Sequence, residues 1–286
     1  MAKSANKIVN KPQHQQRPGK EKTMQPQPVS DNGEQLVPKL KGKVLLITGG
    51  DSGIGKAVSV LFAKEGADIA IVYLNETDDA ADTKKQVEGY GRKCLLIRGD
   101  IAKENFCRVA VQKTVNYYKR IDILINNAGL HYETKDAMDI DTKKMRRTFE
   151  VNIFAMFYLV KYALKHMKKG ACIINTSSVT AYRGSPHLMD YAATKGAIVS
   201  FTRSLASNLI KKGIRVNGVA PGPIWTPLIP SSFKKERVAK HGSQAPMERA
   251  GQPVEVAPAY LFLACDDASY ISGQFIHPNG GEIVNG

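Results

Sequence analysis

The chain has 286 residues, of which 43% are hydrophobic and 23% are charged, and these proportions exclude a collagen-like or fully disordered protein. The formal charge is +15 at pH 7, but acids are interspersed among the basic residues and no arginine-rich run occurs, so specific binding of nucleic acid is not expected. No apolar run reaches the ~18 residues that span a bilayer, and no apolar secretory signal follows the first lysine. A cytoplasmic protein that does not bind membranes is therefore expected.

Residues 1–38 differ in composition from the rest of the chain. They are rich in Gln, Lys, Pro and Asn and nearly free of large apolar side chains. Such a segment cannot bury enough apolar surface to offset the entropy that is lost on ordering. We expect a polar N-terminal arm, extended or disordered, over residues 1–38 and one folded domain over residues 39–286.

After Lys41, short apolar runs rich in Val and Ile alternate with amphipathic runs. The apolar runs lack polar alternation and therefore predict buried parallel strands over residues 43–48, 68–74, 93–98, 121–126, 171–176, 214–219 and 274–277. The amphipathic runs predict helices over residues 54–65, 77–89, 103–119, 142–168, 189–211 and 253–265. This alternation predicts a single α/β domain with a doubly wound, seven-stranded parallel sheet flanked by helices.

A glycine-rich turn, Thr48-Gly49-Gly50-Asp51-Ser52-Gly53-Ile54-Gly55, follows the first predicted strand. A dinucleotide site needs glycine for a tight turn, for close approach of the backbone to the pyrophosphate, and for close packing of helix on strand; Gly49, Gly53 and Gly55 have these places. The start of the following helix then offers free N–H groups to the phosphates. A structural turn that binds no ligand is the alternative.

Three further motifs follow predicted strands in order. Residues 99–101 read Gly-Asp-Ile, residues 126–129 read Asn-Asn-Ala-Gly, and residues 221–226 read Pro-Gly-Pro-Ile-Trp-Thr. With the TGxxxGIG form of the glycine turn, they resemble the short-chain dehydrogenase/reductase family over about residues 41–286. The chain also looks like a bacterial subgroup of uncharacterised oxidoreductases and general stress proteins with a Pro-rich N-terminal extension.

The resemblance implies a Rossmann-type catalytic domain and an NAD(P)-dependent enzyme. Such an enzyme transfers hydride between a nicotinamide cofactor and a small carbonyl or secondary alcohol substrate, and it needs no metal. A non-catalytic nucleotide sensor or scaffold on the same fold is the alternative.

A tyrosine and a lysine stand four residues apart in Tyr191-Ala-Ala-Thr-Lys195, which places both on one face of a helix. The resemblance implies that Tyr191 is the general acid or base and that Lys195 also binds the nicotinamide ribose. An ammonium ~4 Å away contributes ~4 kcal/mol at an effective dielectric of 20, enough to lower the pKa of a tyrosine by up to ~3 units before desolvation is subtracted. We expect Lys195 to act on Tyr191 in this way.

Ser178 follows the fifth predicted strand, 13 residues before Tyr191. Its hydroxyl is suited to donate to the substrate oxygen, so Ser178 and Tyr191 are the expected substrate contacts. Ser177 is the alternative, but the family's spacing favours Ser178. Asn152 lies in the middle of a predicted helix, and the resemblance alone makes it the fourth catalytic residue, which holds a water that links Lys195 to solvent.

The resemblance extends the cofactor site to residues at several strand ends: Gly49, Asp51, Ser52, Gly53, Ile54, Gly55, Tyr73, Leu74, Asp100, Ile101, Asn127, Ala128, Gly129, Tyr191, Lys195, Pro221, Gly222, Ile224 and Thr226. The second predicted strand is followed by Leu74-Asn75-Glu76, without an arginine or lysine to pair with a 2′-phosphate. Lys56 is the only cation near the glycine turn in the sequence. NAD is therefore favoured over NADP.

Residues 222–250 form a connection whose length is typical of a functional lid, with Trp225 as a wall of the site or a packed anchor. His187 either lines the substrate side or belongs to a turn. Sugars, aldehydes, ketones and quinones all stay open as substrates. The histidines form no cluster with acids, and the four cysteines form no CxxC pair, so neither a metal site nor a disulfide framework is expected.

Members of the family commonly form tetramers in which two long helices and the last strand pair across two-fold axes. Here two predicted helices carry more apolar side chains than one face of a sheet needs: Phe149, Ile153, Phe154, Phe157, Tyr158 and Tyr162 in the first, and Ile198, Phe201, Leu205 and Leu209 in the second. Apolar patches of this kind mark interfaces, and closed two-fold symmetry is their common arrangement. A homotetramer is expected, with a dimer as the alternative.

Overall fold

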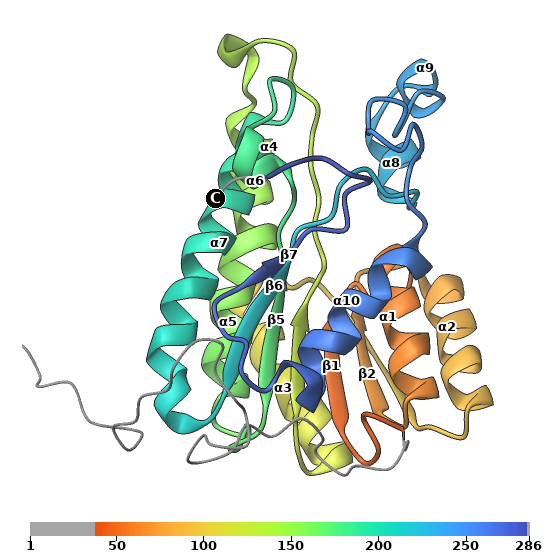
Figure 1. Ribbon diagram of the computed structural model, residues 1–286, viewed down its shortest axis with the longest axis vertical. Coiled ribbons are helices and arrows are strands. Elements are labelled where there is room, and N and C mark those ends of the chain that lie inside the picture. The colour runs from red at the N-terminus through yellow and green to blue at the C-terminus, as the bar shows by residue number, and fades with distance from the viewer. Residues whose placement is uncertain (1–37, 285–286) are drawn as a thin grey trace, which may run out of the picture. The chain divides into compact units, whose positions relative to one another are not determined.

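Seven parallel strands form one sheet in the computed structural model, which describes residues 38–284 (Figure 1). The strands are β1 Val44–Thr48, β2 Asp68–Tyr73, β3 Cys94–Arg98, β4 Ile123–Asn126, β5 Cys172–Thr176, β6 Arg215–Val219 and β7 Phe275–Ile276. Their spatial order is β3-β2-β1-β4-β5-β6-β7, so the direction of winding reverses between β1 and β4. Such sheets bind ligands at this reversal, beyond the carboxyl ends of the strands.

The predicted fold class and all seven predicted strands are confirmed, with strand ends that differ by one or two residues. Residues 1–37 of the predicted polar arm lie outside the described residues. The folded unit begins at Pro38. Leu40 is already part of it, because its side chain is buried and its backbone N–H donates to the carbonyl of Glu65 (2.9 Å).

Helices cover both faces of the sheet. One layer holds α1 Gly53–Lys64, α2 Thr77–Gly89 and α10 Pro253–Ala264, and the other holds α3 Glu104–Tyr118, α5 Ala155–Ala163 and α7 Met189–Leu209. The short helices α4 Thr142–Phe149, α6 Thr180–Arg183, α8 Leu228–Ser232 and α9 Lys235–Val238 lie at the upper end in Figure 1, and 3₁₀ turns span Ala137–Asp139, Ile210–Lys212 and Asp266–Ala268. Within residues 38–284, no helix is both long and apolar enough to cross a membrane.

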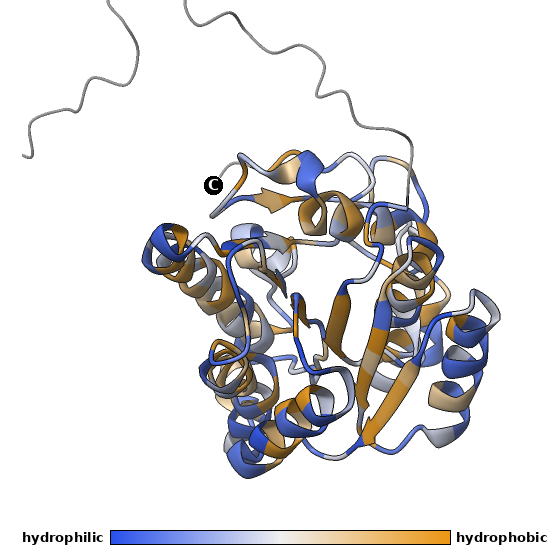
Figure 2. Ribbon diagram, turned by 90° about the horizontal axis from the view of Figure 1, so that it is seen from below, coloured by the Kyte–Doolittle hydropathy of each residue, from blue (hydrophilic) through white to orange (hydrophobic). Residues whose placement is uncertain are grey.

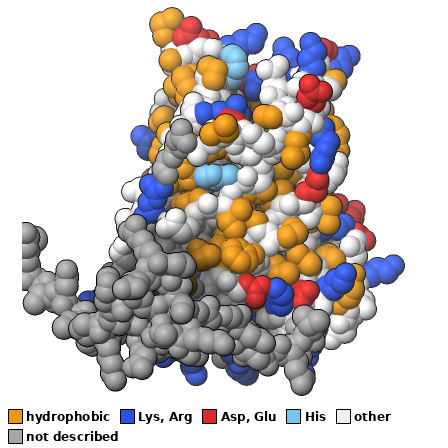
Figure 3. All heavy atoms as spheres, in the orientation of Figure 1, with side chains coloured by type: hydrophobic (Ala, Val, Ile, Leu, Met, Phe, Trp, Pro, Cys, Tyr) orange, Lys and Arg blue, Asp and Glu red, His pale blue; other side chains and the backbone are white. Residues whose placement is uncertain are grey.

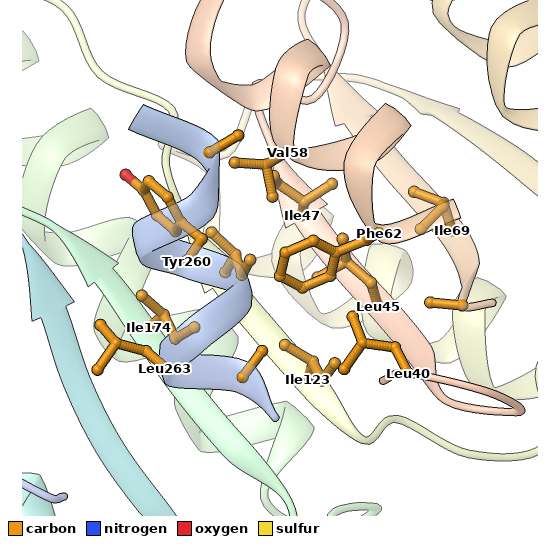
Figure 4. Packing of buried hydrophobic residues seen from close by; sticks show 14 of the residues in the cluster. Leu40, Leu45, Ile47, Val58, Phe62, Ile69, Ile123, Ile174, Tyr260 and Leu263 are labelled. Atoms are coloured by element: carbon orange, nitrogen blue, oxygen red, sulfur yellow. The ribbon is translucent and has the colours of Figure 1, made fainter. Parts of the chain in front are cut away.

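The core has two layers because successive strand residues point to opposite faces. Leu45 and Ile47 of β1 pack with Phe62 of α1 and Tyr260 of α10, whereas Leu46 packs in the layer of α3 and α5 (Figure 4). In Figure 2 the strands in the middle carry mostly hydrophobic residues, and hydrophilic residues are found along the helices that surround them. The sheet is therefore held from both faces, which fixes the strand ends that carry the predicted site.

The helical stretch predicted over residues 142–168 is found from Thr142 to Ala163, but it is not one regular α-helix. A π-helical segment, Glu150–Phe154, separates α4 from α5, and α5 ends at Ala163. A π turn contains one extra residue and shifts the side chains that follow it around the helix axis. Asn152 lies at the centre of this segment, so the irregularity decides where its amide points.

Candidate active site

A cavity of about 1170 Å³ lies beyond the carboxyl ends of the strands. Every residue predicted to bind cofactor or substrate lines it, except Gly55, and so do the predicted catalytic residues Ser178, Tyr191 and Lys195. Asn152 lies outside the lining. The segment with α8 and α9 contributes Leu228, Phe233 and other residues, as the predicted lid requires. Small-molecule pockets usually measure roughly 300–1,000 Å³, so this cavity accommodates a dinucleotide together with a small substrate.

The turn after β1 fits a dinucleotide cofactor. Gly49 has φ +61° and Gly53 has φ +52°, which residues with a Cβ rarely adopt. A Cβ on Gly55 would lie 1.8 Å from the carbonyl oxygen of Gly49, so Gly55 allows α1 to pack closely on the turn. Ser52 precedes α1 without a side-chain capping hydrogen bond, and the first N–H groups of α1 thus stay available to an anion.

The Asn-Asn-Ala-Gly motif after β4 holds this turn in place. Oγ1 of Thr48 accepts hydrogen bonds from the backbone N–H groups of Asn127 (3.0 Å) and Ala128 (3.1 Å). Nδ2 of Asn127 donates to the carbonyl oxygen of Gly49 (3.0 Å). The ends of β1 and β4, where the winding of the sheet reverses, are thereby tied together.

Gly55→Ala is expected to lower the thermal stability, although alanine normally favours a helix over glycine by ~1 kcal/mol. The new Cβ would collide with the Gly49 carbonyl, and overpacking of this kind costs about 1–3 kcal/mol, or roughly 2–4 °C of Tm for each kcal/mol. Gly89→Ala is the matched control, because Gly89 ends α2 with open space around it. Thermal denaturation of both variants checks this; a Tm for Gly55→Ala that equals the control's would contradict the close packing.

The predicted adenine-side acid, Asp100, is already paired. Its carboxylate accepts two hydrogen bonds from the Arg147 guanidinium of α4 (2.9 and 3.0 Å) and one from the backbone N–H of Ala102 (3.0 Å). Burial opposes ionisation of Asp100, but these hydrogen bonds outweigh it and hold the pKa of the carboxyl below its usual range. Nothing in the sequence indicates this pair, because Arg147 is 47 residues away.

Ser178 and Tyr191 meet in the cavity, at the end of β5 and in the first turn of α7. Both side chains line the cavity, and Ser178 is close enough to the Tyr191 phenol to lower its pKa. The Ser178 Oγ also accepts a hydrogen bond from the backbone N–H of Thr180 (3.2 Å). The alternative, Ser177, donates its hydroxyl to the carbonyl of Lys195 (2.9 Å). Of the two serines, Ser178 is therefore the one whose hydroxyl lies beside the tyrosine.

Lys195 lies one helical turn after Tyr191, and only 2% of it is exposed. Its Nζ donates to the carbonyl oxygen of Thr176 (2.8 Å) and lies 5.3 Å from the centroid of the Tyr191 ring. The Thr176 hydroxyl in turn shares a hydrogen bond with Tyr260 of α10 (2.7 Å). Burial lowers the pKa of Lys195 to about 7.

The expected lowering of the Tyr191 pKa by Lys195 is wrong for the protein without cofactor. Burial raises the pKa of Tyr191 to about 12, and the hydrogen bond with Ser178 opposes only part of this rise. The charge of Lys195 alone would lower the pKa of Tyr191, but desolvation of both buried groups acts in the opposite direction. In the structure, desolvation decides the direction of the pKa shift for both Tyr191 and Lys195. It also leaves Lys195 only partly protonated near pH 7, which reduces the positive charge that acts on Tyr191.

Asn152 connects the π segment with the loop after β4. Its Oδ1 accepts from the backbone N–H of Leu130 (2.9 Å), and its Nδ2 donates to the carbonyl oxygen of Leu130 (2.9 Å) and to Oγ1 of Thr194 (3.2 Å). A Cβ on Gly129 would lie 3.4 Å from Asn152 Oδ1 and 3.6 Å from Lys195 Nζ. Both polar groups therefore approach the same glycine, although they do not bond to each other directly.

The structure decides between the alternative positions that the sequence allowed for Trp225 and His187. Trp225 is 47% exposed and lies outside the cavity lining, so it is not a wall of the site. His187 is exposed and also lies outside the lining, whereas His131 and His241 line the cavity. Residues 38–284 hold no group of three His, Cys, Asp or Glu side chains that could bind a metal ion, and the four cysteines are free and buried.

Known proteins of similar sequence are oxidoreductases or stress proteins. The chain is 59% identical to Uncharacterized oxidoreductase YhxC of Bacillus subtilis, over 96% of both chains. It is 55% identical to General stress protein 39 of the same organism, over 93% of this chain and 94% of that protein. It is 52% identical to NADPH-dependent aldehyde reductase 1, chloroplastic, of Arabidopsis thaliana, over 96% of this chain and 97% of that protein. The predicted resemblance to bacterial oxidoreductases and stress proteins is confirmed.

Solved structures agree with these relatives. A short chain dehydrogenase from Burkholderia cenocepacia in complex with NADP has a TM-score of 0.80 and 32% identity, and the match covers 85% of this chain and 98% of that one. A 3-ketoacyl-(acyl-carrier-protein) reductase from Brucella melitensis complexed with NADH has a TM-score of 0.75 and 32% identity, with the same coverage. The family model described as Enoyl-(Acyl carrier protein) reductase matches residues 49–282. The chain therefore belongs to the short-chain dehydrogenase/reductase family and is a nicotinamide-dependent oxidoreductase.

Proposed function

We propose that Ser178, Tyr191, Lys195 and Asn152 carry out hydride-transfer chemistry on a small carbonyl compound or secondary alcohol. The observation that carries this proposal is the convergence of Ser178, Tyr191 and Lys195 on the cavity that the glycine turn borders. The substrate class has the support of the Arabidopsis relative, which is an aldehyde reductase by name.

A bound nicotinamide supplies the hydride in reduction and accepts it in oxidation. In reduction, the Tyr191 phenol gives its proton to the substrate oxygen, while the Ser178 hydroxyl donates a hydrogen bond that stabilises the negative charge developing there. Lys195 binds the ribose hydroxyls through Nζ and renews the proton on Tyr191. Asn152 holds a water near Gly129 that connects Lys195 to solvent. These roles use the proximity of Tyr191 and Lys195 and the shared approach of Lys195 and Asn152 to Gly129.

A screen of cofactor turnover tests this function. The purified protein is incubated with NADH or NADPH and a panel of aldehydes, ketones and sugars, and the loss of reduced cofactor is followed by absorbance. We expect turnover with at least one small aldehyde or ketone and none in a Ser178→Ala/Tyr191→Phe double variant that still binds cofactor. Equal turnover in that double variant would reject the assigned site.

We also propose that NAD(H) binds more tightly than NADP(H). Glu76 and Asp79 line the cavity beyond the end of β2, next to Leu74. Two basic residues in this region are already paired: Arg147, which lines the cavity, with Asp100, and Lys56 with Asp82. Arg98 ends β3 opposite Tyr73, but it is exposed and lies outside the cavity lining. A 2′-phosphate at this end would approach the carboxylates of Glu76 and Asp79 and lose hydration, while the cavity-lining Arg147 is already engaged by Asp100.

Parallel fluorescence titrations with NADH and NADPH are expected to give a Kd about 10-fold lower for NADH, which corresponds to ~1.4 kcal/mol. Glu76→Gln should narrow the difference, because it removes one of the two carboxylates. The Arabidopsis relative is NADPH-dependent by name, and one structural neighbour holds NADP. A preference for NADH in the titrations would therefore distinguish this protein from both of them. Tighter binding of NADPH would contradict the preference and would indicate that Lys56 leaves Asp82 to meet the phosphate.

The exposed apolar side chains support a homotetramer. On the layer of α5 and α7, Phe154 and Phe157 are 45% and 50% exposed, and the Phe157 ring stacks on Phe201 with 4.0 Å between centroids. On the opposite layer, Val254 and Phe262 of α10 are exposed, and hydrophobic side chains gather on the face that Figure 3 shows. Two apolar faces on opposite layers suit two sets of two-fold contacts. Three of the side chains that the sequence placed in the excess are instead buried within the chain: Ile153, Ile198 and Leu209.

Light scattering at micromolar concentration is expected to give four times the chain mass of 31.3 kDa. Phe157→Asp should give a smaller assembly, because it places a charge on one apolar face, whereas Lys161→Glu on the same helix should not. A wild-type mass near that of one chain would overturn the tetramer.

A further inference from the structure

His131 is a buried histidine that the proposed chemistry does not use. It lies in the loop between β4 and α4, lines the active-site cavity, and is only 6% exposed. Its ring meets the Tyr191 ring edge to face, with 5.2 Å between centroids, and the Phe233 ring at 5.0 Å. Neither ring nitrogen has a hydrogen-bond partner among the described residues.

The surroundings of His131 keep its ring uncharged. Burial lowers the pKa of His131 to about 4, the positive charges of Lys195, Arg237 and His241 act in the same direction, and Asp190 opposes them. A neutral imidazole presents one N–H donor and one nitrogen acceptor. Leaving buried polar atoms of this kind unpaired is destabilising, and the aromatic neighbours Tyr191 and Phe233 offer no compensation.

The partner that this ring fits is a hydroxyl group, because a hydroxyl also both donates and accepts. The Tyr191 phenol marks the position of the reacting oxygen in the proposed function, and His131 packs directly against the ring that carries this phenol. A group that reaches His131 is therefore close to the reacting carbon. We propose that His131 binds a hydroxyl on the carbon next to the reacting carbonyl, so that the preferred substrates are 2-hydroxy aldehydes and ketones and the corresponding vicinal diols.

The segment with α8 and α9 covers this contact. Phe233 packs on the imidazole, and the Arg237 guanidinium lies 4.2 Å from the centroid of the Phe233 ring. Arg237 also forms an ion pair with Glu133, two residues after His131. Both ring nitrogens are enclosed, so the proposed contact requires the Phe233 side chain to move aside when a substrate binds.

The inference rests on the proposed function. Three aldehydes of equal chain length allow a failure of the inference to be distinguished from a failure of the proposed function. The kcat and KM are measured for 2-hydroxypropanal, 3-hydroxypropanal and propanal at saturating reduced cofactor. We expect wild-type protein to prefer 2-hydroxypropanal over both others. His131→Phe keeps an aromatic ring among aromatic neighbours, and it should lower kcat/KM for 2-hydroxypropanal by about 10- to 100-fold, mainly through KM, while kcat/KM for propanal changes less than about 3-fold.

Two further variants make the result specific. His131→Gln retains a donor and an acceptor and should recover most of the preference for 2-hydroxypropanal. His187→Gln, an exposed histidine outside the cavity lining, should behave as wild type. An equal loss with all three aldehydes in His131→Phe, or equal use of them by wild-type protein, would overturn the inference and leave the proposed function standing. Failure of wild-type protein to reduce any of the three would reject the proposed function for small aldehydes, and the inference with it.

Discussion

Tyr191→Phe is expected to lower kcat by about 10³-fold, within the range that a positioned proton donor contributes. The variant keeps the ring that packs against His131 and loses only the phenolic oxygen beside Ser178. Among the described residues, no second side chain with a transferable proton is placed beside Ser178 as Tyr191 is. We therefore expect no other residue to replace Tyr191 as the proton donor, and we expect KM to stay close to the wild-type value. Steady-state kinetics with the best substrate of the screen measure the effect.

Cofactor titration is the control for this variant. The Kd for reduced cofactor should stay within about 3-fold of wild type, since the glycine turn and Lys195 are untouched. A Tyr191→Phe protein that keeps more than a tenth of the wild-type kcat would remove Tyr191 from the mechanism. A large rise in Kd would instead show that the phenol acts mainly in binding.

Lys195→Met is expected to lower kcat by about 10²-fold and to weaken cofactor binding by about 10-fold, the latter from the loss of a charge-assisted hydrogen bond. Because Lys195 renews the proton on Tyr191 in the proposed mechanism, the pH profile of alcohol oxidation should change as well. Kinetics and fluorescence titration over a pH series measure both effects. Loss of kcat with an unchanged Kd would exclude Lys195 from binding the cofactor.

The same variant should be more stable than wild type when no cofactor is present, and by more at pH 7 than at pH 9. The pKa of Lys195 is about 7 in the folded protein, below the ordinary value of 10.5. Between these values the unfolded chain binds more protons than the folded one, so the stability of wild type rises with pH in this window. Since methionine carries no charge, the Tm advantage of Lys195→Met should shrink from pH 7 to pH 9; a constant difference would contradict a buried, pKa-lowered lysine.

Much of the fold was readable from the sequence because its signals are local. The strands are buried on both faces and therefore appear as uninterrupted Val- and Ile-rich runs, and the glycines of the turn after β1 are required by left-handed φ angles and by the close approach of Gly55 to Gly49. Each predicted site motif follows a strand, and parallel strands end at one edge of the sheet. This is why widely separated residues were assigned correctly to one cavity.

The features that the sequence did not reveal depend on tertiary contacts. The π-helical segment around Asn152 continues the axis of α4 into α5, so the apolar pattern on either side looks like one helix. The Asp100–Arg147 pair joins the loop after β3 to α4, and no spacing rule connects these two residues. The direction of the Tyr191 pKa shift depends on desolvation, which is set by packing rather than by the distance between two charges.

His131 is a case in which residue identity was visible and its surroundings were not. It stands two residues after the Asn-Asn-Ala-Gly motif, where a turn histidine and a cavity histidine look the same in a sequence. The distinction comes from its 6% exposure and from its two ring nitrogens, neither of which has a hydrogen-bond partner within residues 38–284. Ile198 and Leu209 show the converse, because their helical spacing is the same whether they face a second chain or, as found, the core.

Transfer of isotope from cofactor to product is the most direct measurement of the central claim. Cofactor carrying deuterium at C4 of the reduced nicotinamide, in each of the two stereochemical forms, is turned over with the best carbonyl substrate in ordinary water, and the alcohol is analysed by mass spectrometry. Direct hydride transfer predicts one deuterium on the carbinol carbon from one form and none from the other. An unlabelled alcohol from both forms, despite stoichiometric oxidation of the cofactor, would contradict it.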